Sequence, residues 1–168
     1  RRQRQMCIRD SYYISTESSP LKRDLYRVGL DGKHKERLTP GDGYYSIYPS
    51  ADLSYYICEG GDSSAPGRTD VFNAAGKRVR TLYDNAPLKE ALVEAGLPVR
   101  EFFTFTTERG DELNGYMLKP LDFDPAKRYP VLLTQYSGPG SQQVAEGWGP
   151  DWEDALVTHG YICLLYTS

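Results

Sequence analysis

The residues of this sequence best suited to chemistry stand where an apolar run meets a glycine-rich loop. The run covers residues 131–136 and the loop covers residues 137–143. A run of valine and leucine without polar alternation predicts a buried, central strand of an α/β sheet. Ligands of open α/β sheets bind at the carboxyl ends of the strands. The sequence therefore predicts a binding edge where this strand ends, with Tyr136 as its last residue.

Hydroxyl and imidazole groups elsewhere do not form a recognisable nucleophile. Ser137 and Ser141 lie in the loop, but neither stands in a Gly-x-Ser-x-Gly turn, so we interpret both as loop residues. His34 belongs to a charged hairpin arm and is predicted to be solvated. His159 precedes a glycine at an expected helix end, where it can interact with the helix dipole. Neither histidine has a serine or cysteine nearby in sequence, so neither is predicted to act in a triad.

Both ends of the chain differ in sequence pattern from the rest, and the DNA that could encode one end is the reverse complement of the DNA that could encode the other. Residues 5–10 can be encoded by CAG ATG TGT ATA AGA GAC followed by AG, and the reverse complement of this DNA encodes residues 163–168. Two ends that encode an inverted repeat resemble translated sequencing adapters of the transposon type. We therefore interpret residues 1–11 and 163–168 as adapter-derived and exclude them from the fold prediction. The alternative is a basic, disordered N-terminal arm that binds nucleic acid or phospholipid.

The composition of the remaining chain excludes several functions. Removing four arginines and Asp10 lowers the basic residues from 20 to 16 and the acidic residues from 23 to 22, so the net charge changes from −3 to −6. An acidic chain without a basic stripe argues against a nucleic-acid partner, because phosphate binding requires clustered lysine and arginine. Only Cys58 remains of three cysteines, which excludes an internal disulfide or a cysteine metal cluster. It is predicted to be a small, half-buried strand residue.

Residues 12–99 show the pattern of short β-strands and tight turns. Asp31-Gly32 favours a type I′ hairpin turn, and residues 75–77 join a second hairpin. In each hairpin Gly-Lys is followed by a leucine six positions after the glycine, and the glycines, Gly32 and Gly76, are 76 − 32 = 44 residues apart. This period is typical of propeller blades, with a β-sandwich as the alternative. The tyrosines on these strands are predicted to pack between blades rather than to stack on bases or sugars.

A predicted helix and a change of sequence pattern after it mark a domain junction. Residues 85–96 predict a helix with Asn85 or Ala86 as its cap, proline in the first turn, and Gly96 as its end. Two strands follow, over residues 101–107 and 112–118. We place the domain boundary near residue 99.

Three segments after this boundary resemble a known family. Residues 129–142 read Tyr-Pro-Val-Leu-Leu-Thr-Gln-Tyr-Ser-Gly-Pro-Gly-Ser-Gln, which is similar to the first long strand and oxyanion loop of dipeptidyl-peptidase IV-like peptidases, a branch of the prolyl oligopeptidase family. Residues 113–124 are similar to the lead-in to their hydrolase domain, and residues 151–162 to the helix and strand start that follow. The resemblance implies the last blades of a β-propeller in residues 12–99 and the first part of an α/β-hydrolase domain in residues 100–162.

The resemblance also implies an activity and one catalytic residue. Tyr136 matches the tyrosine whose phenol donates a hydrogen bond to the oxyanion of the tetrahedral intermediate. The family's serine elbow, acid and histidine are expected beyond residue 162. We therefore expect a fragment of a serine peptidase that releases N-terminal dipeptides with proline or alanine second, and expect the fragment itself to be inactive. The alternatives are another hydrolase of the family, such as an oligopeptidase or acylaminoacyl peptidase, and a non-catalytic propeller that binds peptides.

Partners and location follow from the same resemblance. No metal or organic cofactor is implied, and the expected partners are peptides, with homodimerisation of the complete parent. The parent is expected to be periplasmic or secreted, with any signal peptide upstream of this chain.

Overall fold

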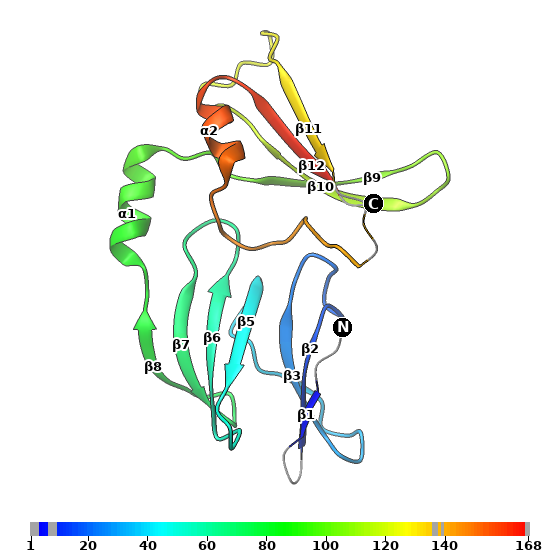
Figure 1. The fold of residues 1–168 in the computed structure, drawn as a ribbon, viewed down its shortest axis with the longest axis vertical. Coiled ribbons are helices and arrows are strands. Elements are labelled where there is room, and N and C mark those ends of the chain that lie inside the picture. Colours follow the sequence, from blue (N-terminus) through cyan, green and yellow to red (C-terminus); the bar gives the residue numbers. More distant parts are fainter. Residues whose placement is uncertain (1–3, 7–9, 136–137, 139, 167–168) are drawn as a thin grey trace. The chain divides into compact units, whose positions relative to one another are not determined.

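The structure is a computed structural model that describes residues 4–6, 10–135, 138 and 140–166. The chain divides into two compact units, which are described separately (Figure 1). Unit 1 comprises Arg1–Ala86 with Glu146–Trp148, and unit 2 comprises Pro87–Ala145 with Gly149–Ser168. The regular secondary structure of the described residues is mostly β-strand, with two α-helices. None of the described helices has the length and apolar character to cross a membrane.

Unit 1 consists of two four-stranded antiparallel sheets in which consecutive strands are neighbours. The first sheet contains β1 (Arg4–Met6), β2 (Asp10–Ser15), β3 (Asp24–Gly29) and β4 (Glu36–Arg37). The second contains β5 (Tyr44–Pro49), β6 (Tyr55–Gly61), β7 (Arg68–Asn73) and β8 (Arg78–Tyr83). The predicted strands of this part are therefore present. Each sheet is an up-and-down meander, since short turns can join only antiparallel neighbours.

The hairpin at Gly32 differs from the predicted type I′ turn. Gly32 has φ +78°, but Asp31 is not among the described residues with positive φ, whereas a type I′ turn requires positive φ at both central residues. Gly32 N donates to the Gly29 carbonyl at 2.9 Å, and Gly29 N donates to the Lys33 carbonyl at 2.9 Å. These bonds define a three-residue loop that ends in a left-handed glycine next to a bulge. Two consecutive positive-φ residues are therefore not needed.

The same loop is built at Gly76, in the corresponding hairpin of the second sheet. Gly76 has φ +75° and donates to the Asn73 carbonyl at 2.9 Å, while Asn73 N donates to the Lys77 carbonyl at 3.0 Å. Gly32 and Gly76 both lie between the third and fourth strands of their sheets. The spacing of 44 residues noted in the sequence is therefore the distance along the chain between equivalent turns of two sheets with the same strand order.

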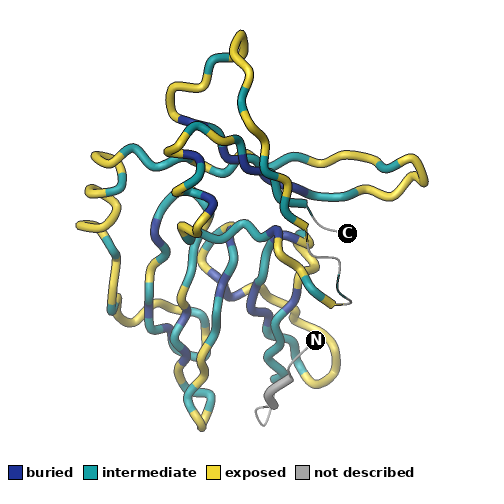
Figure 2. The backbone as a smooth tube through the Cα atoms, turned by 45° about the horizontal axis from the view of Figure 1, so that its top comes forward, coloured by how far each residue is buried: buried dark blue, intermediate teal, exposed yellow. Residues whose placement is uncertain are grey.

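The core of unit 1 is formed by aromatic and aliphatic residues from both sheets (Figure 2). Its buried members are Leu25, Leu38, Tyr45, Tyr56, Cys58 and Phe72, with Tyr12, Ile14 and Ile47 packed against them. The rings of Tyr56 and Phe72 are stacked, with centroids 5.3 Å apart. The phenols that enter this core find backbone acceptors, as Tyr56 Oη does at the Leu38 carbonyl at 3.3 Å. Tyrosines therefore pack between the sheets here.

Cys58 is predicted to resist alkylation in the folded chain. Only 3% of the residue is exposed. Burial, with the negative charges of Asp70 and Asp24, raises the pKa of its thiol to about 12, so the reactive thiolate is scarce near neutral pH. Iodoacetamide at pH 8 should modify Cys58 far more slowly in buffer than in urea, as measured by peptide mapping. Between pH 7 and 9 the alkylation rate of glutathione, the reference thiol, should begin to level off, whereas the alkylation rate of Cys58 in the folded chain should keep rising. Equal alkylation rates of Cys58 in buffer and in urea would contradict its burial.

Unit 2 contains a mixed four-stranded sheet in the order β11-β12-β10-β9. Its elements are α1 (Ala86–Ala95), β9 (Glu101–Thr106), β10 (Glu112–Leu118), β11 (Val131–Gln135), α2 (Trp152–Thr158) and β12 (Ile162–Tyr166). β9, β10 and β12 are antiparallel neighbours, whereas β11 and β12 are parallel. Parallel strands require a crossover connection, and α2 lies within it. This helix packs against β10 and β12 (Figure 1).

The prediction of a buried, central strand over residues 131–136 is wrong for the described sheet. β11 lies at one edge of it, and Val131 and Leu133 are each 56% exposed. The apolar run has the composition of a strand covered on both faces. In the described chain, however, β12 pairs with it on one side only, and α2 packs on β10 and β12. The composition of a strand indicates which side chains it could bury, whereas their actual burial depends on which other segments of the chain cover them.

Residues excluded from the fold prediction take part in strands. β1 lies entirely within residues 1–11 and pairs with β2, and β2 itself begins at Asp10. Residues 163–166 belong to β12, where Cys163 is 1% exposed. In the described structure these residues are therefore part of the sheets. A β-ladder is made by backbone groups, so residues of any origin can occupy a strand position if their side chains fit.

The helix predicted over residues 85–96 is confirmed as α1, but the division into units comes earlier than residue 99. The two units separate after Ala86, so α1 belongs to unit 2 except for its first residue. The helix ends at Gly96, which has φ +63° and donates to the Leu92 carbonyl at 3.0 Å. A Cβ added to Gly96 would come within 2.9 Å of Leu121 Cδ1. The end of α1 therefore packs beside the segment that follows β10.

Candidate functional site

Helix α2 carries the side chain of Glu153, which contacts β11 near the end of that strand. Asp151 caps this helix: its side chain accepts from Trp152 N at 2.7 Å, and the Asp154 side chain accepts from Asp151 N at 2.7 Å. This reciprocal capping box satisfies backbone donors that the first turn leaves free. The buried residues of the helix are Glu153 and Val157, four positions apart and so on one face. That face packs on the sheet.

Glu153 joins α2 to three strands. The residue is 3% exposed. Tyr116 Oη on β10 donates to Glu153 Oε2 at 2.6 Å, and Thr134 Oγ1 on β11 donates to Glu153 Oε1 at 3.0 Å. The Cys163 thiol on β12 contacts the Glu153 carbonyl oxygen at 3.8 Å. We call Glu153, Tyr116 and Thr134 the carboxylate cluster.

The surroundings of Tyr116 keep its phenol protonated. Burial, the hydrogen bond to Glu153 and the charge of that carboxylate raise the pKa of Tyr116. The guanidinium of Arg100, with Cζ 4.8 Å from the centre of the Tyr116 ring, acts in the opposite direction but is outweighed. Arg100 itself donates to the Gly149 carbonyl at 2.6 Å. The phenol is therefore a stable donor to the carboxylate, not a source of tyrosinate.

The chemistry of the carboxylate cluster is structural. Both Glu153 oxygens are engaged by hydroxyl donors and the residue is almost inaccessible, so no substrate can reach it in this arrangement. Among the described residues no group of histidine, cysteine, aspartate and glutamate side chains is placed to hold a metal ion. The cluster can fix the position of α2 against β10 and β11. It cannot by itself cleave a bond.

Comparison with known proteins connects this geometry to a family. Residues 8–66 match the family model for the dipeptidyl peptidase IV (DPP IV) N-terminal region. The chain is 36% identical to a crystal structure of Porphyromonas gingivalis dipeptidyl peptidase 4, with a TM-score of 0.86, over 94% of this chain and 22% of that one. The chain belongs to the dipeptidyl-peptidase IV-like family. Its mostly β architecture is consistent with the propeller region of that family.

Curated relatives of the dipeptidyl-peptidase IV-like family agree with this assignment. A probable dipeptidyl-aminopeptidase B of Podospora anserina is 32% identical over 91% of this chain and 17% of its own length. A probable dipeptidyl peptidase 4 of Emericella nidulans is 35% identical over 82% of this chain and 18% of its own length. The chain thus spans less than a fifth of the length of these relatives.

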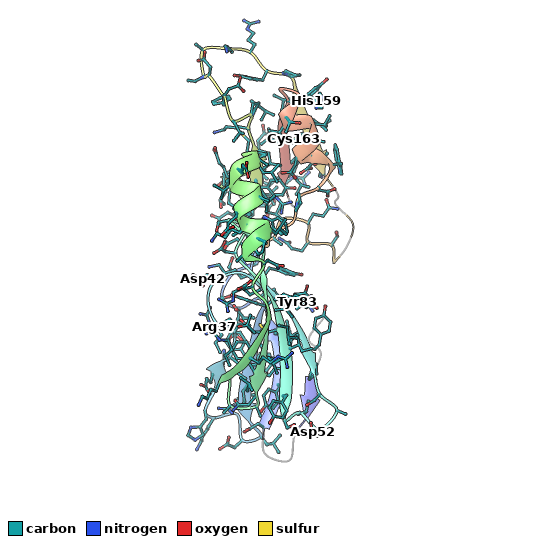
Figure 3. The ribbon with its side chains drawn as sticks, turned by 90° about the vertical axis from the view of Figure 1, so that its left-hand side faces the viewer. Arg37, Asp42, Asp52, Tyr83, His159 and Cys163 are labelled. Carbon is teal, nitrogen blue, oxygen red and sulfur yellow. The ribbon has the colours of Figure 1, made fainter. Side chains whose placement is uncertain are left out.

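The residues predicted from sequence as a site are placed as follows. Tyr136, which was predicted to be the oxyanion donor, and Ser137 lie outside the described residues. Ser141 lies in the loop, where its N–H donates to the Gly138 carbonyl at 3.1 Å. His34 is an exposed hairpin residue of unit 1 with φ +55°. His159 is the C-cap of α2, and its Nδ1 donates to the Ala155 carbonyl at 2.7 Å (Figure 3).

Sequence reasoning missed the carboxylate cluster. Glu153 directly follows the start of α2, where an acidic residue is expected to complement the helix dipole in solvent. Its spacing of four residues from Val157 was the available signal, because it places the acid on the apolar face. Tyr116 and Thr134 carried no such signal, since each is an ordinary strand residue until the sheet brings it to α2.

Proposed function

We propose that this chain is part of a serine-type dipeptidyl peptidase that releases X-Pro and X-Ala dipeptides from the amino termini of peptides. The observation that carries the proposal is the likeness to the Porphyromonas gingivalis dipeptidyl peptidase 4 structure, at 36% identity over 94% of this chain. Relatives named as dipeptidyl peptidases or dipeptidyl-aminopeptidases support the same class.

The domains that accompany this proposal are the last propeller blades in residues 12–99 and the start of an α/β-hydrolase domain in residues 100–162. Two four-stranded antiparallel sheets with equivalent hairpins 44 residues apart support the blades. A mixed sheet whose parallel pair is joined through α2 supports the hydrolase domain. We propose that residues 1–11 and 163–168 are adapter-derived.

In the proposed reaction, a serine supplied by the rest of the parent attacks the carbonyl of the second residue of the peptide. The tetrahedral intermediate carries a negative oxygen, and the phenol of Tyr136 donates a hydrogen bond to it. Collapse of the intermediate releases the shortened peptide and leaves a dipeptidyl ester on the serine, which water then hydrolyses. A neutral donor of this kind stabilises charge that exists only in the transition state and intermediate.

The exposed edge at β11 supports the proposal that further strands belong to this sheet in the parent. Val131 and Leu133 are strongly exposed on a strand whose composition suits burial on both faces. A segment that pairs with β11 would cover this edge and could carry the serine, acid and histidine. We further propose that the parent is periplasmic or secreted, forms a homodimer and needs no metal or organic cofactor.

The chain alone is expected to show no turnover of glycyl-prolyl p-nitroanilide. It would contain one group that stabilises the oxyanion, the proposed Tyr136 phenol, and no activated nucleophile. The measurement compares the purified 168-residue chain with the complete protein and with the complete protein bearing alanine at its elbow serine. Only the unsubstituted complete protein should release nitroaniline, and it should do so with a burst under acyl-enzyme accumulation. Appreciable hydrolysis by the pure chain would overturn the proposed division of the catalytic parts.

Other substrates separate the alternatives. Cleavage of an N-acetylated alanyl anilide, with none of the glycyl-prolyl one, would indicate an acylaminoacyl peptidase. Cleavage after an internal proline of a blocked peptide would indicate an oligopeptidase. A complete protein with an altered elbow serine and no hydrolysis, but with measurable peptide binding, would be a non-catalytic propeller protein.

A further inference from the structure

The outermost strand of the second sheet, β8, has a weak backbone attachment. In the described sheet it pairs with β7 alone, and five of its six residues are exposed. Its register with β7 shifts twice, and the register pairs neither Val79 nor Leu82 with a residue of β7. Each bulge of this kind interrupts the row of backbone hydrogen bonds. A strand with few buried side chains and an interrupted ladder belongs to the part of a fold that opens most easily.

A cluster of polar side chains lies between these two interruptions. Asp70 on β7 stands directly opposite Thr81 on β8, and Thr81 Oγ1 donates to Asp70 Oδ1 at 2.6 Å. Arg68 contacts both residues: its Nη2 donates to Thr81 Oγ1 at 3.1 Å, and its Nε lies 3.5 Å from Asp70 Oδ2. Arg78 Nη1 lies 3.9 Å from the same carboxylate oxygen. We call Asp70 and Thr81 the β8 clasp.

The burial of Asp70 indicates that the clasp serves attachment. Asp70 is 5% exposed and stands opposite Cys58 of β6, which belongs to the core of unit 1. A carboxylate loses its hydration at such a position, and an apolar side chain there would cover the core as well or better. The side chains of Arg68 and Arg78 are 48% and 54% exposed, so their ion pairs with Asp70 contribute little. The bond from the Thr81 hydroxyl is therefore the strongest of these side-chain ties between β7 and β8.

The first sheet repeats this arrangement with other residues. Asp24, the first residue of β3, is 1% exposed, and Thr39 Oγ1, two residues after β4, donates to Asp24 Oδ1 at 2.6 Å. Ser18 Oγ donates to the other oxygen at 2.6 Å, and Arg37 Nη1 lies 3.8 Å from Oδ1. The fourth strand, β4, has only two residues. In both sheets a buried aspartate of the third strand thus accepts from a threonine on, or just after, a poorly paired fourth strand.

We propose that the outer strand of each sheet is a strap that opens locally, and that the buried aspartate–threonine bond sets how often it opens. In the second sheet the strap is the middle of β8. Its ends are tied separately, by the hairpin at Gly76 and by Asn85, whose Nδ2 donates to the Gly67 carbonyl at 2.5 Å. β8 is also the last strand before α1. This role does not depend on the proposed peptidase activity.

The test is amide hydrogen exchange of the folded 168-residue chain, followed residue by residue by NMR. Thr81→Val keeps the branched shape and the strand preference of the side chain but removes the hydroxyl. The β8 amides that are protected in the unsubstituted chain should exchange about 10- to 100-fold faster in this variant, because a hydrogen bond to a charged acceptor shifts a local opening equilibrium by about that factor. Amides of β6, inside the same sheet, should keep their exchange rates.

Two matched variants of β8 control for packing and for substitution itself. Thr81→Ser keeps the hydroxyl, and Val79→Thr makes the reverse isosteric change at a position that is 57% exposed. Both should leave β8 exchange within about threefold of the unsubstituted chain. Unchanged β8 exchange in Thr81→Val would show that the ladder holds the strand. An equal acceleration of β6 and β8, or an effect of Thr81→Ser as large as that of Thr81→Val, would assign the change to general stability or to packing. Each of these results would overturn the proposed strap.

The first sheet provides an independent test of the same device. Leu38 N donates to the Leu25 carbonyl at 2.8 Å, beside the bond from Thr39 to Asp24. Thr39→Val should make the Leu38 amide exchange about tenfold faster or more, whereas Thr39→Ser should restore its protection. Urea unfolding of each variant shows that the chain is folded under the conditions of exchange. An unchanged Leu38 rate in folded Thr39→Val would overturn the strap in this sheet.

Discussion

Replacing Tyr136 by phenylalanine in the complete protein is expected to lower kcat for glycyl-prolyl p-nitroanilide by about 10²–10³-fold, equivalent to ~2.7–4 kcal/mol. The change removes one hydroxyl and keeps the ring. Because the proposed hydrogen bond forms only to the negative oxygen of the intermediate, KM should change little. Steady-state kinetics with the purified variant measures both constants.

Tyr161→Phe is the matched control for this experiment. Tyr161 is 38% exposed and precedes β12, so the same chemical change there removes a hydroxyl without a proposed catalytic role. Its kcat should equal that of the unsubstituted protein. A Tyr136→Phe variant with unchanged kcat, beside an active parent, would remove Tyr136 from the oxyanion site.

Replacing Phe72 by alanine is expected to lower the free energy of unfolding of unit 1 by ~3–5 kcal/mol. Phe72 is 4% exposed and stacks on Tyr56, with ring planes inclined by 8°. The truncation loses the transfer free energy of the ring and leaves a cavity that the surrounding strands can fill only in part. Urea unfolding followed by far-ultraviolet circular dichroism measures the change in midpoint and slope.

Val79→Ala on β8 serves as the exposed control for the Phe72 experiment. Val79 is 57% exposed, so its truncation should cost about 1 kcal/mol or less. Equal midpoints for the two variants would show that the cluster around Tyr56 and Phe72 is not the core of unit 1. A reduced slope for Phe72→Ala alone would indicate a change in the cooperativity of unfolding.

Local features of this fold could be predicted because their causes lie within a few residues. Pro87 and Gly96 bracket α1, since proline suits a first turn and glycine adopts the left-handed angle at a helix end. The repeated Gly-Lys pattern at Gly32 and Gly76 indicated two equivalent hairpins, and the structure places both between third and fourth strands. The turn type was predicted wrongly because one glycine in a bulge and two positive-φ residues in a type I′ turn leave similar sequence signals.

The family was recognisable from sequence, whereas the environment of β11 was not. The strand, loop and lead-in motifs around Tyr136 occur in order along the chain, and the comparisons confirm the family they indicated. The apolar run in β11 indicated that the strand could be covered on both faces. Its place at the edge of the described sheet depends on which strands pair with it, and this is a property of the assembled sheet.

The amino-acid sequence by itself determined most of the strands, the end of α1 at Gly96, the repeated hairpins and the family. Only the tertiary structure decided that Glu153 would meet Tyr116, 37 residues earlier, and Thr134, 19 residues earlier. The physical reason is the separation along the chain of the residues that interact. Caps, turns and strand alternation follow from steric and hydrogen-bonding constraints between near neighbours, whereas the partners of a buried carboxylate are chosen only when distant strands and a helix pack together.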